Sequence, residues 1–451
     1  MFTNNATAMA TENGSHKMDK LIIEYGKTVT FTAQTKDSWP QWNMTEFPAG
    51  GGDLVVGFGG LASSDNRAMA LNGNITLAND GTRDAFIEAT SGKVTINGNL
   101  AITGESTDAR ILGRNNMEII GNVALDTSTK NRNVRITRAV VNGNLAGSGY
   151  IQLDSEGGDK QCSLNGDNRN FHGRIDKLFD NGCILGGPNA AGTNIEWHVT
   201  GDLHLVAENG QVWKFGALNF AWSNWNVCYI TKDAAITLEV GSLDQDMTFQ
   251  NAYKFWGEGQ NTDIDVTIRK VGTGKLTTGA YNYKNLIVEA GEVALDKPTA
   301  FDNRNFKNVN SVSVSSGATI SGYPGTQADG GMYIETLTLA PGAIVKETLV
   351  ATTENEVTTY SCPVLTATGD VNVSGVKFVL DDPSGHLISA EYDESNIEKY
   401  TILQTNTVTG RPTADVIAKM ATSNWGWRAF VEAGNTVVVK PATKMMVILI
   451  R

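Results

Sequence analysis

The sequence predicts an all-β protein, a right-handed parallel β-helix with irregular capping ends. Three observations predict it: short strands of alternating hydrophobicity, Gly-Asn steps at nearly constant spacing, and the lack of helical periodicity over any useful length. In such a solenoid each coil of chain stacks on the one before and shares one core with it. An apolar fraction of 41% is ample for that core, so the chain is not of the disordered class.

The alternation is clearest in KVTINGNLAITG at 93–104. Val94, Ile96, Leu100 and Ile102 fall on one face, and the residues between them are mostly Thr and Asn. A period of two residues is typical of a strand buried on one side. Gly98 marks a bend between two such strands.

The Gly-Asn steps repeat along the N-terminal half. Their glycines stand at positions 73, 98, 121 and 143, so the steps are 22–25 residues apart. That spacing lies within the range of solenoid repeats. Both residue types tolerate positive φ, so we expect a left-handed backbone at these corners.

Other architectures fit less well. The nearest approach to a helical pattern is PTADVIAKMAT at 412–422, where we expect one short helix. A sandwich of antiparallel strands would also have short strands and frequent turns, but the constant spacing favours the solenoid.

We expect an N-terminal cap with the first strands at 1–50, the β-helix at 51–384 and a C-terminal β cap at 385–451.

Composition excludes several partners and cofactors. The net charge is -12, which argues against nucleic acid and against anionic lipid. No apolar run is long enough for a membrane span, and no signal peptide is visible in MFTNNATAMATENG. The four cysteines form no CxxC pair, and we expect no cofactor.

Several stretches resemble the autotransporter-associated β-strand repeat, found in passenger regions of bacterial surface proteins. RKVGTGKLTTGAYNYKNLIVEAGEVALDK at 269–297 resembles the repeat itself, and SLNGDNRNFHGRIDKLFDNGCILGG at 163–187 resembles a variant of it. The strand pairs at 309–322 and 334–345 are similar to its later units. The resemblance implies a passenger-like β-helix that is secreted or displayed on the cell surface.

Enzyme signatures are weak. Pectin-degrading hydrolases of β-helix fold carry a Gly-His-Gly that this sequence lacks, and no Gly-x-Ser-x-Gly elbow occurs. We therefore predict no catalytic residues. Outward carboxylates on neighbouring coils could still supply the pair that glycoside hydrolysis needs, so a polysaccharide lyase or glycoside hydrolase stays as an alternative.

The best candidate ligand site is FAWSNWN at 220–226. Trp222 and Trp225 could stack on sugar rings while Asn224 and Asn226 bind their hydroxyls. The competing interpretation is a corner plugged by tryptophan, or a contact between domains.

Two histidines and two carboxylates alternate in IEWHVTGDLHLV at 195–206. We expect Ile195, Trp197, Val199, Leu203 and Leu205 to point inward. Glu196, His198, Asp202 and His204 would then point outward, where a bend at Gly201 could bring them to a divalent metal. Their spacing matches no known ligand motif, so a solvated polar face is favoured and no metal is predicted.

Cys162 and Cys183 lie 21 residues apart, close to one coil. Stacked on adjacent coils they would be near the Cα separation that a disulfide tolerates. A disulfide and two buried thiols are both open at this point.

These observations lead to a functional expectation. We expect an extracellular or outer-surface structural or adhesive protein that binds a glycan or a host or cell-surface ligand through the side of the solenoid. A carbohydrate-active enzyme is one alternative. A self-assembling filament subunit is another, associating through end strands such as MMVILI at 445–450.

Overall fold

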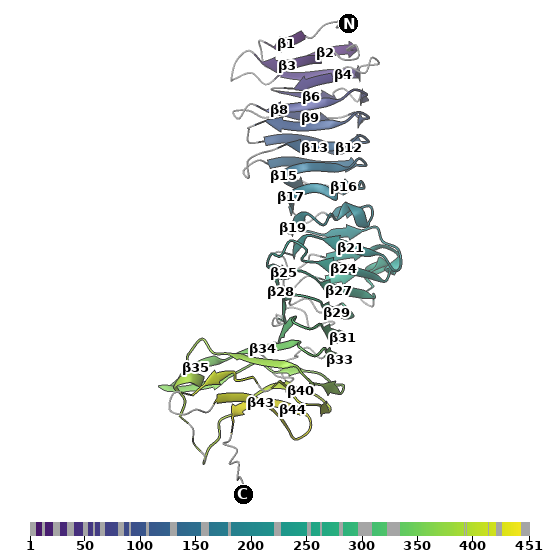
Figure 1. Cartoon of the computed structure of the whole chain (residues 1–451). Coiled ribbons are helices and arrows are strands. Elements are labelled where there is room, and N and C mark those ends of the chain that lie inside the picture. Colours follow the sequence, from purple (N-terminus) through teal and green to yellow (C-terminus); the bar gives the residue numbers. More distant parts are fainter. Residues whose placement is uncertain are drawn as a thin grey trace. The chain divides into compact units, whose positions relative to one another are not determined.

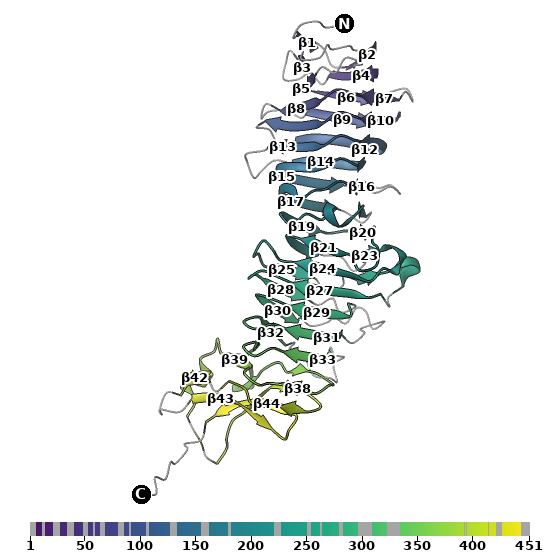
Figure 2. The same cartoon turned by 45° about the vertical axis from the view of Figure 1, so that its right-hand side comes forward.

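The computed structural model of this chain describes residues 6–10, 14–20, 28–33, 40–47, 53–56, 59–63, 68–79, 85–89, 92–104, 108–126, 133–154, 162–178, 182–220, 227–249, 254–261, 264–278, 283–295, 309–322, 334–391, 393, 395–413, 415–420 and 426–442. Strands make up 60% of the structure and helices 4%. Stacked parallel strands form a β-solenoid (Figures 1 and 2), so the predicted fold class is confirmed. The chain divides into two compact units: residues 1–236 with 256–261, and residues 237–255 with 262–451.

The coils of the first unit build three parallel ladders of different length. The first ladder contains β1 (Ala6–Ala10), β3 (Thr28–Ala33), β5 (Asp53–Val56), β8 (Ile75–Asn79), β11 (Leu100–Gly104), β13 (Val123–Asp126) and the start of β15 (Leu145–Asp154).

The second ladder contains β2 (Gly14–Lys20), β4 (Pro40–Phe47), β6 (Gly59–Ser63), β9 (Ala85–Ala89), β12 (Asp108–Ile119), β14 (Asn133–Val141), the rest of β15, β17 (Asn170–Leu178), β19 (Ile195–Val199) and β22 (Ala217–Phe220). The third contains β7 (Met69–Leu71), β10 (Val94–Ile96), the ends of β12 and β14, β16 (Cys162–Leu164), β18 (Cys183–Leu185), β20 (Leu203–Leu205) and β23 (Val227–Ile230).

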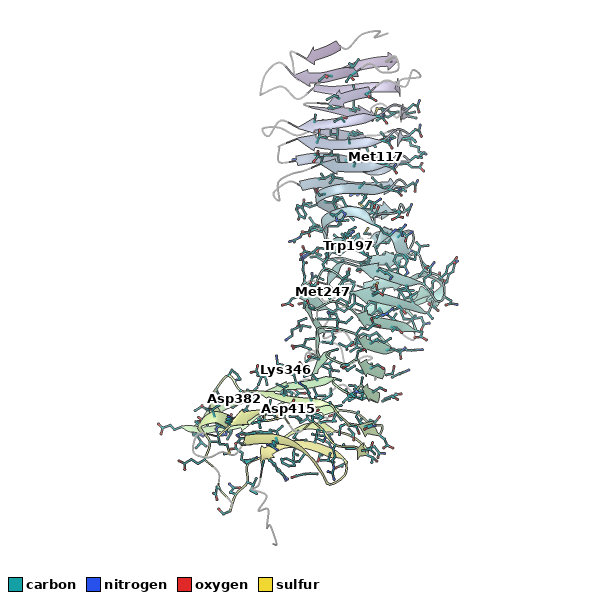
Figure 3. The ribbon with its side chains drawn as sticks, viewed as in Figure 1. Met117, Trp197, Met247, Lys346, Asp382 and Asp415 are labelled. Atoms are coloured by element: carbon teal, nitrogen blue, oxygen red, sulfur yellow. The ribbon has the colours of Figure 1, made fainter. Side chains whose placement is uncertain are left out.

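The core of this unit is a stack of aliphatic columns. One column in the third ladder is 0–1% exposed throughout: Leu71, Ile96, Ile119, Val141, Leu164, Leu185, Leu205 and Ile230. Full burial of each such side chain is worth about 1.5–3 kcal/mol. Larger side chains enter the same interior. Trp197 (Figure 3) is fully buried, and its Nε1 donates to the carbonyl oxygen of Ala191 at 2.7 Å.

The Gly-Asn steps form the corners between the third ladder and the first, but not for the reason expected. Gly98, Gly121, Gly143 and Gly166 all lack positive φ, so the predicted left-handed backbone is wrong. Glycine is required there because a Cβ on Gly98 would lie 2.0 Å from the carbonyl oxygen of Gly73 one coil earlier, and the same clash recurs at Gly121, Gly143 and Gly166. Close backbone approach, rather than conformational freedom, selects glycine.

The asparagines of these corners bind one another from coil to coil. The amide oxygen of Asn74 accepts the backbone N–H of Asn99 at 3.2 Å, and Asn99 accepts that of Asn122 at 3.1 Å. The ladder continues through Asn144 to Asp167. Each corner therefore satisfies the backbone of the next, which stabilises the stack because buried or constrained N–H groups need partners.

The second unit has two parallel ladders. One contains β25 (Met247–Phe249), β28 (Lys275–Thr278), β30 (Glu292–Leu295), β32 (Thr319–Ser321), β34 (Ile344–Thr348) and β39 (Lys377–Asp381). The other contains β27 (Val266–Lys270), β29 (Asn285–Val288), β31 (Val309–Val314) and β33 (Ile334–Leu339).

The C-terminal part of the second unit contains antiparallel pairs beside two parallel pairs, β37 (Leu365–Thr366) with β40 (Tyr400–Gln404) and β38 (Val371–Asn372) with β41 (Val408–Thr409). In the antiparallel pairs, β40 pairs with β44 (Thr436–Pro441), β44 with β43 (Gly426–Glu432), and β43 with β42 (Ala418–Lys419), while β35 (Val350–Glu354) and β36 (Val357–Ser361) form a separate hairpin. The short helix expected at 412–422 is not present among the described residues of that stretch, which contain the two-residue strand β42 instead.

The remaining elements are short. They are β21 (Val212–Phe215), β24 (Ile236–Val240), β26 (Lys254–Trp256), the helix α1 (His386–Ser389), and the 3-10 turns at Pro188–Ala190, Thr231–Asp233 and Glu258–Gln260. Within the described ranges, no helix has the length and apolarity that a membrane crossing needs.

Residues 1–50, where we expected a cap with the first strands, hold β1–β4. These strands already pair in parallel with the strands that follow them. The antiparallel strands β40, β42, β43 and β44 lie within the expected C-terminal cap at 385–451.

Candidate functional site

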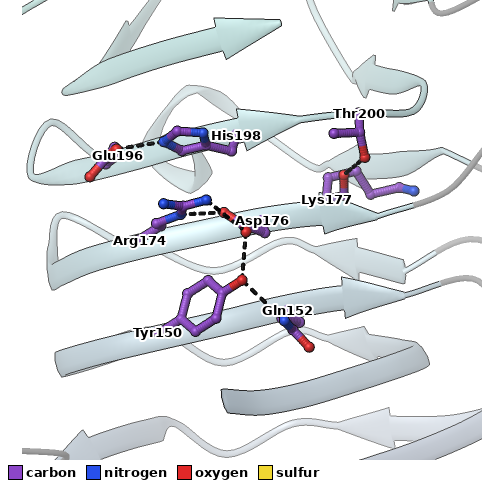
Figure 4. A network of polar contacts seen from close by, with 8 residues as sticks. All are labelled: Tyr150, Gln152, Arg174, Asp176, Lys177, Glu196, His198 and Thr200. Carbon is purple, nitrogen blue, oxygen red and sulfur yellow. Dashed lines mark hydrogen bonds and ion pairs between the residues drawn. The ribbon is translucent and has the colours of Figure 1, made fainter. Parts of the chain in front are cut away.

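The second ladder of the first unit carries a network of polar side chains on its outer surface (Figure 4). Successive strands β15, β17 and β19 place Tyr150, Arg174 and Glu196 in one column. A second column, two residues further along each strand, contains Gln152, Asp176 and His198. These six residues are called the polar face below.

Asp176 is the centre of the polar face. Its carboxylate accepts two hydrogen bonds from Arg174, Nε to Oδ1 at 2.6 Å and a terminal nitrogen to Oδ2 at 2.9 Å. The hydroxyl of Tyr150 on the neighbouring coil donates to Oδ2 at 2.5 Å. Because Asp176 is only 7% exposed, these charge-assisted bonds are partly shielded from water and hold their geometry firmly.

The Tyr150 ring is fixed from two sides. Its hydroxyl also accepts a hydrogen bond from Nε2 of Gln152 at 3.0 Å, and the guanidinium of Arg174 lies 5.6 Å from the ring centre. Burial and the hydrogen bond to Asp176 raise the pKa of Tyr150 above its usual value. The phenol therefore stays neutral and serves as a positioned ring with a bound hydroxyl.

Two further pairs extend the polar surface. Nε2 of His198 lies 2.5 Å from Oε1 of Glu196 within β19. Arg135 on β14 binds Asp154 on β15 through Nε at 2.8 Å, and Asp154 is fully buried. Thr200 and Lys177, also drawn in Figure 4, join through a backbone oxygen, since the Thr200 hydroxyl donates to the Lys177 carbonyl at 2.7 Å.

The polar face offers an ordered aromatic ring beside both donors and acceptors. The side chains of Arg174, Glu196 and His198 are 44%, 29% and 26% exposed, so solvent or a ligand can reach them. Sequence reasoning placed Glu196 and His198 outward but missed the other four residues and the link between the coils. The available signal was the outward position of Tyr150 and Gln152 in GYIQLD, but the partners lie a full coil away.

The predicted glycan residues Trp222, Asn224, Trp225 and Asn226 lie outside the described residues. The strand that follows them is described. Tyr229 on β23 stacks on the His204 imidazole at 4.5 Å between ring centres and meets the Trp256 ring edge-on at 5.9 Å. This aromatic cluster is a second outward feature of the first unit.

The predicted alternation in 195–206 is confirmed. Ile195, Trp197, Val199, Leu203 and Leu205 are all 0% exposed, and Glu196, His198, Asp202 and His204 lie partly exposed between them. The four polar residues do not converge: Glu196 and His198 pair with each other, whereas Asp202 and His204 have other neighbours. Burial lowers the pKa of His204 to about 4, and Asp202 accepts the backbone N–H of Val227 at 2.9 Å. The described residues contain no group of three or more His, Cys, Asp or Glu side chains that could hold a metal ion.

Cys162 and Cys183 occupy the same register position on β16 and β18, as the stacking of coils predicted. Both are buried free thiols in this structure. Lys177 is fully buried near them, and desolvation lowers its pKa; its Nζ donates to the carbonyl oxygen of Leu178 at 2.6 Å. The run MMVILI at 445–450 lies outside the described residues.

The second unit holds a titratable cluster that the sequence did not single out. Nε2 of His386 lies 2.7 Å from Oε1 of Glu398, and the same carboxylate oxygen accepts the hydroxyl of Tyr400. The imidazole stacks on Tyr360 with 3.7 Å between ring centres. His386 thereby joins the hairpin β35–β36 to α1 and to the residues preceding β40.

No protein-family model matches the chain, and no curated protein matches it either. The resemblance to autotransporter-associated repeats therefore stays a prediction.

Proposed function

We propose that this chain is a structural or adhesive protein that is secreted by a bacterium or displayed on its cell surface. We propose also that it binds its ligand through the polar face on the side of the solenoid. The observation that carries the proposal is the arrangement around Asp176. The buried carboxylate of Asp176 holds an aromatic ring from the neighbouring coil and a guanidinium from its own strand in fixed positions, while both remain partly accessible. Such preorganisation lowers the entropic cost of binding.

The same arrangement suits binding better than catalysis. A general base needs a pKa near the working pH, whereas the pKa of Tyr150 is raised further above that range. Both oxygens of Asp176 already accept hydrogen bonds from side chains of the polar face. The sequence resemblance to surface-protein repeats supports the extracellular setting.

The proposal is tested by measuring adhesion and turnover together. Purified protein is applied to immobilised bacterial and host cells and to a glycan array. Released reducing ends and unsaturated sugars are assayed in parallel. We expect retention without product, and about tenfold weaker retention for Tyr150→Ala. The matched control Tyr229→Ala, which removes an outward tyrosine of another ladder, should retain binding. Product release, or equal adhesion by Tyr150→Ala, would contradict the proposal.

A further inference from the structure

We infer that the ligand of the polar face is a neutral polysaccharide whose chain crosses β15, β17 and β19. This inference rests on the proposed function and names the chemistry of its ligand. Three features of the face carry it: its charge balance, the bonding of its strands, and the mixture of groups around the Tyr150 ring.

Charge balance disfavours a polyanion. The guanidinium of Arg174 is held by Asp176, and that of Arg135 by Asp154. The imidazole of His198 lies against Glu196. The whole chain carries a net charge of -12, so an acidic polymer would be repelled at long range. A strongly cationic ligand would have to compete with the arginines for their carboxylates.

Strand bonding disfavours an extended peptide. Peptides commonly bind sheets by adding a strand to an exposed edge. Here β15 pairs with β14 and β17, and β17 pairs with β15 and β19, so neither strand presents an open edge. A ligand on this surface must contact side chains alone.

The side chains that remain match a hydroxyl-rich ligand. The half-buried Tyr150 ring offers an apolar surface on which the C–H face of a sugar can lie, since aromatic faces are both apolar and weakly negative. Around it, Arg174 and Gln152 carry N–H donors and Glu196 carries a carboxylate acceptor. A sugar hydroxyl donates and accepts at once, and so can use both kinds of group.

The spacing of the strands fits a chain of repeating units. Neighbouring strands of a sheet lie roughly 4.8 Å apart, close to the length that one sugar unit adds to an extended polysaccharide. Each coil of the solenoid could therefore meet one sugar. The columns Tyr150–Arg174–Glu196 and Gln152–Asp176–His198 would line such a path.

The test is native gel electrophoresis of the full chain through gels that contain one polysaccharide each. The neutral probes are galactomannan, xyloglucan and dextran, and the acidic probes are polygalacturonate and alginate. We expect at least one neutral probe to retard the protein and neither acidic probe to do so. Tyr150→Ala should weaken the retardation about tenfold. Tyr150→Phe keeps the ring but loses the hydrogen bond to Asp176, so it should show a smaller loss. Tyr229→Ala should behave as wild type, and circular dichroism confirms that each variant is folded.

Several results would overturn the inference. They are retardation by an acidic probe alone, unchanged retardation of Tyr150→Ala, or no retardation by any neutral probe. If no neutral probe retards the protein but adhesion to cells still depends on Tyr150, the proposed function stands and only the identity of the ligand as a neutral polysaccharide is refuted. Adhesion that is independent of Tyr150 would remove both.

Discussion

Gly121 lies directly against Gly98 of the preceding coil, so closely that a Cβ on Gly121 would stand 2.0 Å from the Gly98 carbonyl oxygen. The contact recurs between Gly143 and Gly121 and between Gly166 and Gly143. The corner glycines are therefore packed as a column in which each excludes a side chain from the next. The lack of side chains in this column lets the coils approach to the spacing of hydrogen-bonded strands.

Gly121→Ala should destabilise the protein. No flexible side chain is available to move, because the atoms that meet the new methyl are backbone. We expect a loss of about 2–3 kcal/mol in unfolding free energy. The control is Gly187→Ala, where the backbone is extended and no atom lies within 4 Å of the new Cβ. Urea denaturation of both variants measures the difference, and equal stability would contradict the packing argument.

Ile120→Asn should stabilise the protein. Asn72 and Asn97 bind each other through their side-chain amides at 2.6 Å, and Asn142 and Asn165 do so at 2.7 Å. Ile120 interrupts this series and is 49% exposed. An amide there could join the two pairs, for a gain of about 0.5–1 kcal/mol. Ile120→Ala, which removes the exposed apolar group without supplying an amide, is the matched control. We predict a higher melting temperature for Ile120→Asn than for Ile120→Ala; the reverse order would contradict the prediction.

Glu347 should make stability fall as pH rises. Burial raises its pKa to about 9, against 4.5 ordinarily. Its Oε1 accepts the Gly322 N–H at 2.9 Å, while Oε2 has no hydrogen-bond partner among the described residues. The folded state thus holds a proton that the unfolded state releases between these two pH values. The contribution of Glu347 to the unfolding free energy is fully present below pH 4.5. It is lost as the pH rises towards 9, at up to about 1.4 kcal/mol per pH unit.

Glu347→Gln removes that titration while keeping a neutral acceptor for Gly322. The unfolding free energy of the variant should exceed that of wild type by a margin that grows from pH 5 to pH 9. Parallel denaturation curves across this range provide the measurement. A constant margin would show that Glu347 does not titrate in this window.

The cysteines should resist alkylation in the native state. Cys162, Cys183 and Cys228 are buried, and burial raises the pKa of each thiol; it raises that of Cys362 to about 12. The reactive thiolate is therefore scarce at neutral pH. We expect iodoacetamide to label all four cysteines once the protein is unfolded, with no reductant present, and to label none of them in the folded protein. Mass spectrometry measures the labelling. A Cys162–Cys183 pair that stays unlabelled until a reductant is added would instead be bridged.

The sequence was sufficient for the architecture because inward residues repeat within each strand. The alternation of Val94, Ile96, Leu100 and Ile102 can be read without knowing their neighbours, and all four are buried. The reason for the corner glycines was misjudged, since a clash between coils leaves no mark within a single coil. Backbone freedom was the only property of glycine that one coil could suggest.

The polar face could not be predicted because its partners come from different coils. Tyr150 and Arg174 lie 24 residues apart, whereas Arg174 and Glu196 lie 22 apart. Loops of unequal length separate the strands, so no fixed spacing assigns the columns. Within one strand, by contrast, the outward positions of Glu196 and His198 were predicted correctly.

Covalent footprinting is the most direct test of the claim that the ligand binds the polar face, because it locates bound ligand on the protein. The rates of hydroxyl-radical oxidation at Tyr150, His198 and Tyr229 are compared with and without the retained polysaccharide or cell-surface extract. Ligand on the polar face should slow oxidation of Tyr150 and His198 and leave Tyr229 unchanged. Protection of Tyr229 with Tyr150 and His198 unaffected would place the ligand elsewhere and contradict the account.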